Sequence, residues 1–150
     1  MTKTLKFVAL IAFVGITFAF SKSEPIKITW EILKDVKFSD KWSDEFQAYY
    51  AVPSFGNNIK KYNGQEVQIR GYIIPIDIVD GYYVLSANPY SQCFFCGNAG
   101  PESVMEIQMK KEYRDLRMDQ IITYKGKLRL NKDDIYQLNY ILEDAEIVAR

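Results

Sequence analysis

The fold is decided by the stretch Val67-Gln68-Ile69-Arg70-Gly71-Tyr72-Ile73-Ile74-Pro75-Ile76-Asp77-Ile78. Apolar and polar residues alternate from Val67 to Arg70, which is the pattern of a β-strand with one buried face. After Gly71 the apolar positions move by one residue, to Tyr72, Ile74, Ile76 and Ile78. A one-residue change of phase at a glycine is typical of a β-bulge, which bends a strand sharply. We therefore expect a long first strand that bends at Gly71.

Four further strands are expected downstream, separated by turn residues. Asp80-Gly81 is a hairpin signal that leads into a second strand. The remaining alternating segments predict strands over residues 82–86, 105–109, 122–130 and 136–147. Together they predict a mainly β fold, a small five-stranded OB-like barrel, in which closure leaves no long exposed edge. A sandwich of five or six strands is the alternative.

Residues 1–21 are expected to form a cleaved secretory signal peptide. Lys3 and Lys6 precede an apolar run of 14 residues, and Ala19 and Ser21 are small residues at the positions that a signal peptidase reads. The run is shorter than the roughly 20 residues that a membrane-spanning helix requires. An uncleaved N-terminal anchor is the alternative. No cysteine follows the cleavage position, so a lipoprotein anchor is not expected.

We expect residues 22–62 to form an N-terminal extension that packs on the barrel, and residues 63–150 to form the OB-like barrel itself. Within the extension, residues 29–33 fit a helical turn with Thr29 as its N-cap. They also fit an edge strand, and both interpretations stay open. The sequence contains no repeat, low-complexity tract or second domain.

Residues 43–50 of the extension predict a short helix. Ser43 is a good N-cap, acidic residues follow in the first turn, and Pro53 ends the helix. Large apolar side chains are usually buried. We therefore expect the aromatic residues of the extension to form a lid on the barrel core: Trp30, Phe38, Trp42 and Phe46.

Composition excludes several classes of function. The chain has no histidine, which removes Ser-His-Asp and Cys-His catalytic pairs and zinc sites that contain histidine. Loss of the signal peptide leaves 17 basic and 19 acidic groups, a net charge of −2. A protein that neutralises many phosphates normally carries a clustered positive excess. We therefore expect no nucleic-acid partner and no histidine-dependent enzyme.

Cys93 and Cys96 form the one chemical motif of the chain. They lie in a loop rich in Gly, Pro and Asn between the second and third expected strands. Export favours a structural disulfide, which would add only about 2 kcal/mol because the loop it closes is short. A thiol-disulfide oxidoreductase, with Cys93 attacking and Cys96 resolving, is an alternative. The residues after Cys96 do not continue as the helix that activates thioredoxin-like thiols.

A soft-metal site is the third interpretation of this loop. In Cys-x-x-Cys-Gly the turn lets the thiolates of Cys93 and Cys96 face one ion, and Gly97 supplies the backbone angles. Tetrahedral zinc takes four ligands. Glu102, water or the same cysteine pair of a second subunit would complete the set. Zinc is the cofactor that this interpretation implies.

Aromatic residues flank the cysteines and predict an apolar rim. Tyr90, Phe94 and Phe95 are candidates to contact a partner or to shield the site, and burial of these side chains is the alternative. Gly100 and Pro101 are expected to support the shape of the loop. This loop is thus the expected functional edge of the protein.

The chain resembles a family of uncharacterised secreted bacterial proteins, known as a domain of unknown function. The resemblance is carried by a G-Y-x-x-P block, residues 71–75, by a P-Y-x-x-C loop, residues 89–93, and by the Ile28-Thr29-Trp30-Glu31 segment. Better-known branches have a cysteine followed closely by histidine, whereas this chain has Cys96 and no histidine. The resemblance implies a periplasmic location, a small β-barrel-like domain, and work with envelope transport or metal-handling systems. It supplies no established activity.

These features together predict an exported, periplasmic accessory or binding protein that is not an enzyme. We expect the loop of Cys93 and Cys96 to be its functional edge and zinc to be the cofactor if the loop binds a metal. The expected partner is another envelope protein or a second copy of the chain. We expect no stable membrane span after the signal peptide is cleaved.

Overall fold

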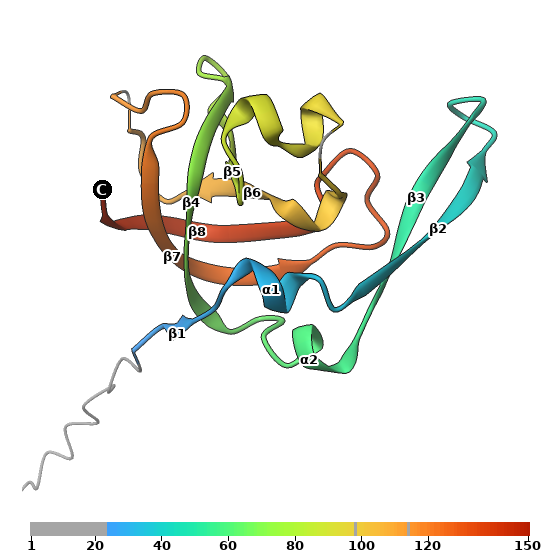
Figure 1. The fold of residues 1–150 in the computed structure, drawn as a ribbon, viewed down its shortest axis with the longest axis horizontal. Coiled ribbons are helices and arrows are strands. Elements are labelled where there is room, and N and C mark those ends of the chain that lie inside the picture. The colour runs from blue at the N-terminus through green and yellow to red at the C-terminus, as the bar shows by residue number, and fades with distance from the viewer. Residues whose placement is uncertain (1–23, 98, 114) are drawn as a thin grey trace, which may run out of the picture.

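Five strands close into a barrel in this computed structural model, which describes residues 24–97, 99–113 and 115–150 (Figure 1). They are β4 (Glu66–Asp77), β5 (Tyr82–Ser86), β6 (Val104–Met109), β7 (Ile121–Leu130) and β8 (Tyr140–Ala149). The strand order is β4-β5-β6-β8-β7, and pairing of β7 with β4 completes the circle. β6 and β8 run parallel, whereas the other barrel neighbours are antiparallel. The prediction of a mainly β, five-stranded OB-like barrel is confirmed, and the sandwich alternative is wrong.

The expected signal peptide, residues 1–21, lies outside the described residues. Within the part of the chain that is described, none of the helices has the length and apolar character needed to cross a membrane.

The shape of β4 differs from the expectation. The register of β4 against β7 runs without a break through Gly71, so the bulge predicted there is wrong. The irregularity lies between Pro75 and Asp77, opposite β5. A Cβ atom at Gly71 would lie 2.5 Å from the carbonyl oxygen of Ser86. Glycine is therefore required because two strands approach closely, and not because an extra residue is inserted.

The barrel interior holds the main hydrophobic core. Its buried side chains come from all five strands and include Val67, Ile69, Ile73, Leu85, Met105, Ile107, Ile122, Tyr124, Leu128, Tyr140 and Leu142. Two one-turn helices, α1 (Trp30–Leu33) and α2 (Asn57–Lys60), add the fully buried side chains of Leu33 and Ile59 to this core. Figure 1 shows both helices at the end of the barrel opposite the β4–β5 turn. The segment before the barrel therefore closes one of its ends.

The N-terminal segment joins the sheet before it turns into a helix. β1 (Ile26–Lys27) pairs in parallel with β4, and α1 begins after Thr29. Residues 29–33, which the sequence left open between two structures, are thus mainly a helical turn. The side chain of Thr29 makes no capping hydrogen bond. The indole nitrogen of Trp30 donates to the carbonyl oxygen of Arg70 at 2.8 Å and ties α1 to β4.

A long β-hairpin, which we call the arm, extends from the barrel. It consists of β2 (Val36–Ser43) and β3 (Ala48–Phe55), which pair antiparallel along their whole length. The helix predicted over residues 43–50 is therefore wrong. Gln47 has a φ of 50°, in the left-handed region, and lies in the turn of the hairpin. Pro53 lies within β3, because the tyrosines and valine around it favour an extended chain.

The predicted aromatic lid is only partly correct. Trp30 packs against the interior core, and Phe38 is half-buried. Trp42 and Phe46, however, are 44% and 47% exposed, so the prediction is wrong for these two. They lie toward the tip of the arm, which Figure 1 shows extending away from the barrel. Because this segment is a hairpin and not a helix, Trp42 and Phe46 lie away from the core on which we expected them to pack.

Strand β8 begins later than the pattern predicts. Tyr136 and Leu138, expected in the fifth strand, lie in the loop of residues 131–139 between β7 and β8. The buried amide nitrogen of Asn131 donates to the carbonyl oxygens of Asp134 at 2.6 Å and of Leu138 at 3.2 Å. These bonds fold the loop back on itself, as asparagine does in turns. The side-chain alternation in this loop is therefore not that of a strand.

Candidate functional site

Residues 87–103, which we call the Cys loop, join β5 to β6. The loop contains three single-turn 3-10 helices, η1 (Tyr90–Gln92), η2 (Phe94–Cys96) and η3 (Pro101–Ser103). At its base the amide of Ala87 donates to the carbonyl oxygen of Ser103 at 2.9 Å. The amide of Tyr90 donates to Oδ1 of Asp119 at 2.7 Å, in the connection between β6 and β7. The loop is thus closed at its base and fastened to the connection between β6 and β7.

Cys93 fixes the Cys loop to the outer wall of the barrel. It is 0% exposed and belongs to a second buried cluster, which we call the outer cluster and which consists of Ile74, Val84, Cys93 and Val104. The half-buried side chains of Tyr82 and Leu138 pack against it. A buried cysteine behaves as a small apolar side chain. The Cys loop therefore covers apolar residues on the outside of β4, β5 and β6.

The outer cluster explains why the apolar pattern of β4 changes after Gly71. Ile73 faces the interior core and Ile74 faces the outer cluster, so both are buried although they point to opposite sides. Ile76 and Ile78, expected to share the inward face, are exposed instead. A strand covered on both faces loses its polar alternation. The apparent change of phase at Gly71 marks the beginning of this doubly covered part.

Cys96 lies at the surface beside Cys93. Both cysteines are thiols in this structure, Cys93 buried and Cys96 exposed. The Sγ atom of Cys96 donates to the carbonyl oxygen of Tyr90 at 3.0 Å. Desolvation, the charge of Cys93 and a hydrogen bond with Cys93 raise the pKa of the Cys96 thiol. A raised pKa reduces the thiolate that disulfide exchange and metal binding require.

The structure brings together two of the proposed metal ligands. Within the described ranges, no group of three or more cysteine, aspartate or glutamate side chains could hold a metal ion, so Glu102 does not join Cys93 and Cys96. Gly97, beside the pair, has a φ of 72°, the left-handed conformation that favours glycine. Two thiols are half of the four ligands that zinc takes. Water or a second copy of the chain would have to complete such a site.

The predicted rim residues and the predicted supporting residues lie in different turns of the Cys loop. Tyr90 and Phe95 are exposed near Cys96, whereas the side chain of Phe94 lies outside what the structure describes. Gly100 precedes η3 as its N-cap, and Pro101 occupies the first turn of η3. Pro101 is half-buried and faces the arm across a small cavity of about 180 Å³.

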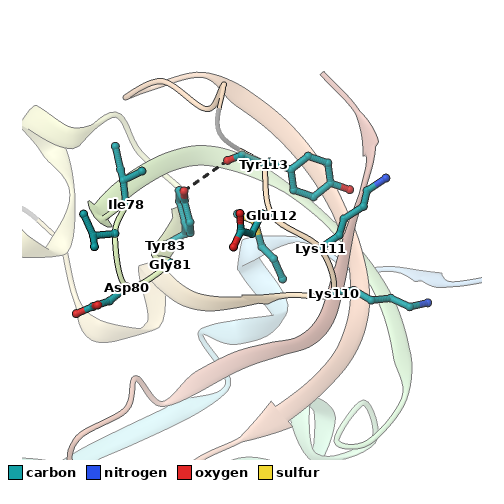
Figure 2. Close-up of a pocket in the computed structure, with 10 residues that line it drawn as sticks. Ile78, Asp80, Gly81, Tyr83, Lys110, Lys111, Glu112 and Tyr113 are labelled. Atoms are coloured by element: carbon teal, nitrogen blue, oxygen red, sulfur yellow. Dashed lines mark hydrogen bonds between the residues drawn. The ribbon is translucent and has the colours of Figure 1, made fainter.

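A larger cavity, which we call the barrel-end cavity, was not found from the sequence. It has a volume of about 700 Å³ and lies between the β4–β5 turn and the chain that leaves β6 (Figure 2). Its lining residues are Ile78, Val79, Asp80, Gly81, Tyr83, Met109, Lys110, Lys111, Glu112 and Tyr113. The signal that could have indicated it is the apolar pair Ile78-Val79 in a turn that Asp80-Gly81 marks as exposed.

The two lysines that line the barrel-end cavity each have a partner, Lys110 outside the cavity and Lys111 on its wall. Lys110 Nζ lies 2.9 Å from Oε1 of Glu146, and the bond to Glu146 raises the pKa of Lys110. Lys111 Nζ lies over the ring of Tyr113, 5.2 Å from its centre. The hydroxyl of Tyr83 donates to the carbonyl oxygen of Tyr113 at 3.5 Å and links the two sides of the cavity.

Comparisons with known proteins identify the fold and leave the activity open. No family model and no curated protein matches the chain. Among solved structures, it is similar to the crystal structure of a DUF3299 family protein from Pseudomonas aeruginosa PAO1. The TM-score is 0.55 and the sequence identity 13%, over 85% of this chain and 97% of that chain. This likeness shows a shared fold with a protein of an uncharacterised domain family, in keeping with the resemblance noted above.

Proposed function

We propose that this chain is a non-enzymatic accessory protein of the bacterial envelope that binds a protein partner at the Cys loop. In this proposal Cys93 and Cys96 are structural and form a disulfide after export. The observation that carries it is the complete burial of Cys93 in the outer cluster, beneath an exposed Cys96. The cysteine pair then acts by holding the Cys loop on the barrel wall.

Burial of Cys93 favours a structural pair over a thiol-disulfide oxidoreductase. An attacking thiol must reach a disulfide of another molecule, and its reactivity depends on thiolate character and access. Cys93 is packed among Ile74, Val84 and Val104, and the accessible thiol, Cys96, has a raised pKa. Neither cysteine therefore combines access with an activated thiolate.

The same geometry supports a structural pair over a zinc site within one chain. Zinc would draw the sulfur of Cys93 out of the outer cluster and would need two further ligands. An oxidising compartment instead favours bonding between neighbouring thiols. A disulfide that closes so short a loop contributes about 2 kcal/mol. A zinc site shared between two copies is the second candidate, and it is supported by the adjacency of the two thiols.

The surface around Cys96 supports binding of a protein partner. Tyr90 and Phe95 expose aromatic rings there, and exposed aromatic residues are enriched at protein interfaces. The backbone of Tyr90 is fixed by Asp119, so the rim is held in place before a partner binds. Preorganisation of this kind lowers the entropic cost of association.

The first experiment measures zinc content and free thiols on mature protein that was exported by its own leader and purified without chelator. We expect no zinc, and no reactive thiol until a reductant is added. One zinc per chain would overturn the structural assignment, and half a zinc per chain would establish a site shared by a dimer. Thiols that react without reductant in metal-free protein would also contradict the proposal.

Cysteine variants separate a structural pair from an exchanger. The Cys96→Ser variant leaves Cys93 buried, so we expect no mixed disulfides with other envelope proteins; an exchanger would accumulate them. Cys93→Ser is the matched control. We expect the double serine variant to fold with a loss of about 2 kcal/mol or less in the free energy of unfolding, measured by urea unfolding.

Cross-linking tests whether a partner binds at the Cys loop. A photo-cross-linking residue at position 95 should give one discrete adduct in intact cells, which the same residue at Lys132 should not.

A further inference from the structure

We infer that the outer edge of β3 in the arm is a docking site for an extended, uncharged segment of a partner polypeptide. The segment adds to the arm as a third strand and places one large apolar side chain between the arm and the barrel. This site goes beyond the proposed function and does not rest on it. Its residues belong to β3, to η3 and the start of β6, and to the loop between β7 and β8.

The outer edge of β3 offers backbone groups that have no partner within the described chain. There, β3 pairs with β2 alone, and the backbone of residues 48–54 makes no hydrogen bond outside that pairing. In an antiparallel pair, every second residue of a strand directs its N–H and C=O groups away from the other strand. A row of such groups is a template for a further strand. An extended polypeptide backbone is therefore the chemistry that satisfies this edge.

Strand β3 lacks the residues that normally block an edge. Native edge strands are protected by charged side chains, especially lysine, and by proline. β2 carries Lys37, Asp40 and Lys41, whereas Ala48–Phe55 contains no charged residue. The one proline of β3, Pro53, is buried toward the base of the arm, which leaves residues 48–52 unblocked. The edge that accepts a strand is thus that of β3, and it favours an uncharged segment.

A small cavity, which we call the arm cavity, lies on the β3 side of the arm. Its volume is about 180 Å³, and the arm residues that line it, Tyr50, Ala51 and Pro53, all belong to β3. Successive side chains of a strand point to opposite faces. A cavity lined by both Tyr50 and Ala51 therefore lies at the edge of β3 and not over one face. A strand that adds to this edge would lie at the mouth of the cavity.

The size and walls of the arm cavity suit one large apolar side chain. An apolar cavity of roughly 150 Å³ holds a benzene molecule, so this cavity has room for one aromatic ring. The apolar walls are supplied by Pro53, Pro101, Val104, Ile135 and Leu138. The charged residues at its rim, Lys132 and Asp134, have opposite signs and favour neither charge. In strand addition, backbone hydrogen bonds supply affinity and such a side-chain pocket supplies specificity.

The arm is held against the barrel on both sides of this cavity. At the base, the rings of Phe55 and Tyr140 lie 5.5 Å apart. At the tip, the hydroxyl of Tyr136 donates to Oε1 of Glu45 at 2.8 Å. The edge and the cavity are therefore positioned before a segment binds, which lowers the entropic cost of association.

The test is a titration of the isotope-labelled mature protein with a capped heptapeptide, acetyl-Thr-Thr-Val-Phe-Val-Thr-Thr-amide, followed by NMR. We expect saturable amide shifts confined to residues 48–53, 101–104 and 132–139, and slower hydrogen exchange in β3. A peptide with alanine in place of phenylalanine should bind about tenfold more weakly, because the cavity stays empty. Methylation of the three central backbone nitrogens should abolish binding. Equal binding of the methylated peptide, or of N-acetylphenylalanine amide, would overturn the proposal.

A charge on the edge tests the same site from the side of the protein. Ala51→Lys should weaken binding of the heptapeptide about tenfold or more, because lysine blocks strand addition. Asp40→Lys is the matched control, since Asp40 lies opposite Ala51 on β2 and both positions are exposed. The control should retain its affinity within about twofold. Equal losses in the two variants, or no loss in Ala51→Lys, would contradict the assignment.

Sedimentation velocity without peptide separates a partner from a second copy of the chain. We expect a monomer at the concentration used for NMR. A dimer that Ala51→Lys dissociates would mean that the β3 edge of another copy occupies the site, and it would overturn the assignment to a partner polypeptide.

Discussion

The barrel and the arm differ in whether the edges of their strands are paired. In the barrel, pairing of β4 with β7 gives each of the five strands two neighbours within the barrel. In the arm, β2 and β3 pair only with each other within the described chain. An isolated two-stranded hairpin is at best marginally stable in water. The barrel is thus held by its own interior, whereas the arm depends on what it touches at its two ends.

The arm contacts the barrel through an aromatic pair at each end. At the base, the ring of Phe55 lies 5.5 Å from that of Tyr140 in an edge-to-face arrangement. At the tip, Phe46 lies 5.8 Å from Tyr136 in the β7–β8 loop. The base pair is buried and the tip pair is exposed. Burial makes the base contact the stronger of the two.

The largest loss of stability is expected from a substitution at Gly71 that disrupts the closure of the barrel. A side chain at Gly71 would meet the carbonyl oxygen of Ser86 and the side chain of Leu85, so Gly71→Val should destabilise the fold by about 3 kcal/mol or more. Urea unfolding measures this loss. The matched control is Gly81→Ala, with a φ of 70° but no atom within 4 Å of the added Cβ. The control should lose only about 1 to 2 kcal/mol, and equal losses in the two variants would contradict the close approach.

The barrel was predictable because its signals are local. Alternating residues and turn dipeptides located β5, β6 and β7, whereas the irregularity of β4 lies between Pro75 and Asp77 and not at Gly71, where it was expected. The sequence could not show that the Cys loop covers the outside of β4, so Ile74 was included in the apolar alternation after Gly71 and Ile73, which faces the interior core, was left out of it. Coverage by a segment distant in sequence is not a local property.

The hairpin of the arm was not predictable, because its local sequence pattern fits two structures. The spacing of Phe46, Tyr49 and Tyr50 fits a helix as well as a hairpin with a turn, and short segments give both patterns. The Cys loop was expected between the second and third strands of the barrel, and it does lie between β5 and β6. The barrel-end cavity was missed because its walls come from the β4–β5 turn and from residues after β6, which only the closed barrel brings together.

An intermediate effect is expected at the joint between the barrel and the segment that bears the arm. The hydroxyl of Tyr140, on β8, donates to the carbonyl oxygen of Leu33 at 2.6 Å, and both residues are fully buried. Tyr140→Phe leaves that carbonyl oxygen without its donor and should cost about 1 to 3 kcal/mol in urea unfolding. Amide hydrogen exchange should become faster in α1 and β2 than in the wild-type protein, and it should change less in β7. Uniform quickening throughout the chain would mean that the joint is not a separate unit.

The smallest effect is expected at the tip of the arm, where a titration would detect a change in the pKa of Tyr136. The hydroxyl of Tyr136 donates to Oε1 of Glu45 at 2.8 Å, and this bond, together with desolvation and the charge of Glu45, raises the pKa of Tyr136. The folded protein thus favours the neutral phenol. Any stability from this contact is present below the ordinary tyrosine pKa of about 10 and is lost as the pH rises through the higher pKa of Tyr136.

Glu45→Gln should therefore bring the phenolate transition of Tyr136 back toward about 10 in an absorbance titration. Subtraction of the Tyr136→Phe titration isolates this residue from the other tyrosines. The melting temperature at neutral pH should not change, because the contact is exposed and the base of the arm stays buried. An unshifted transition would mean that the arm does not hold Tyr136 in solution. The arm would then depend on the barrel at its base alone, and the contrast between the closed barrel and the open hairpin would be greater than this structure indicates.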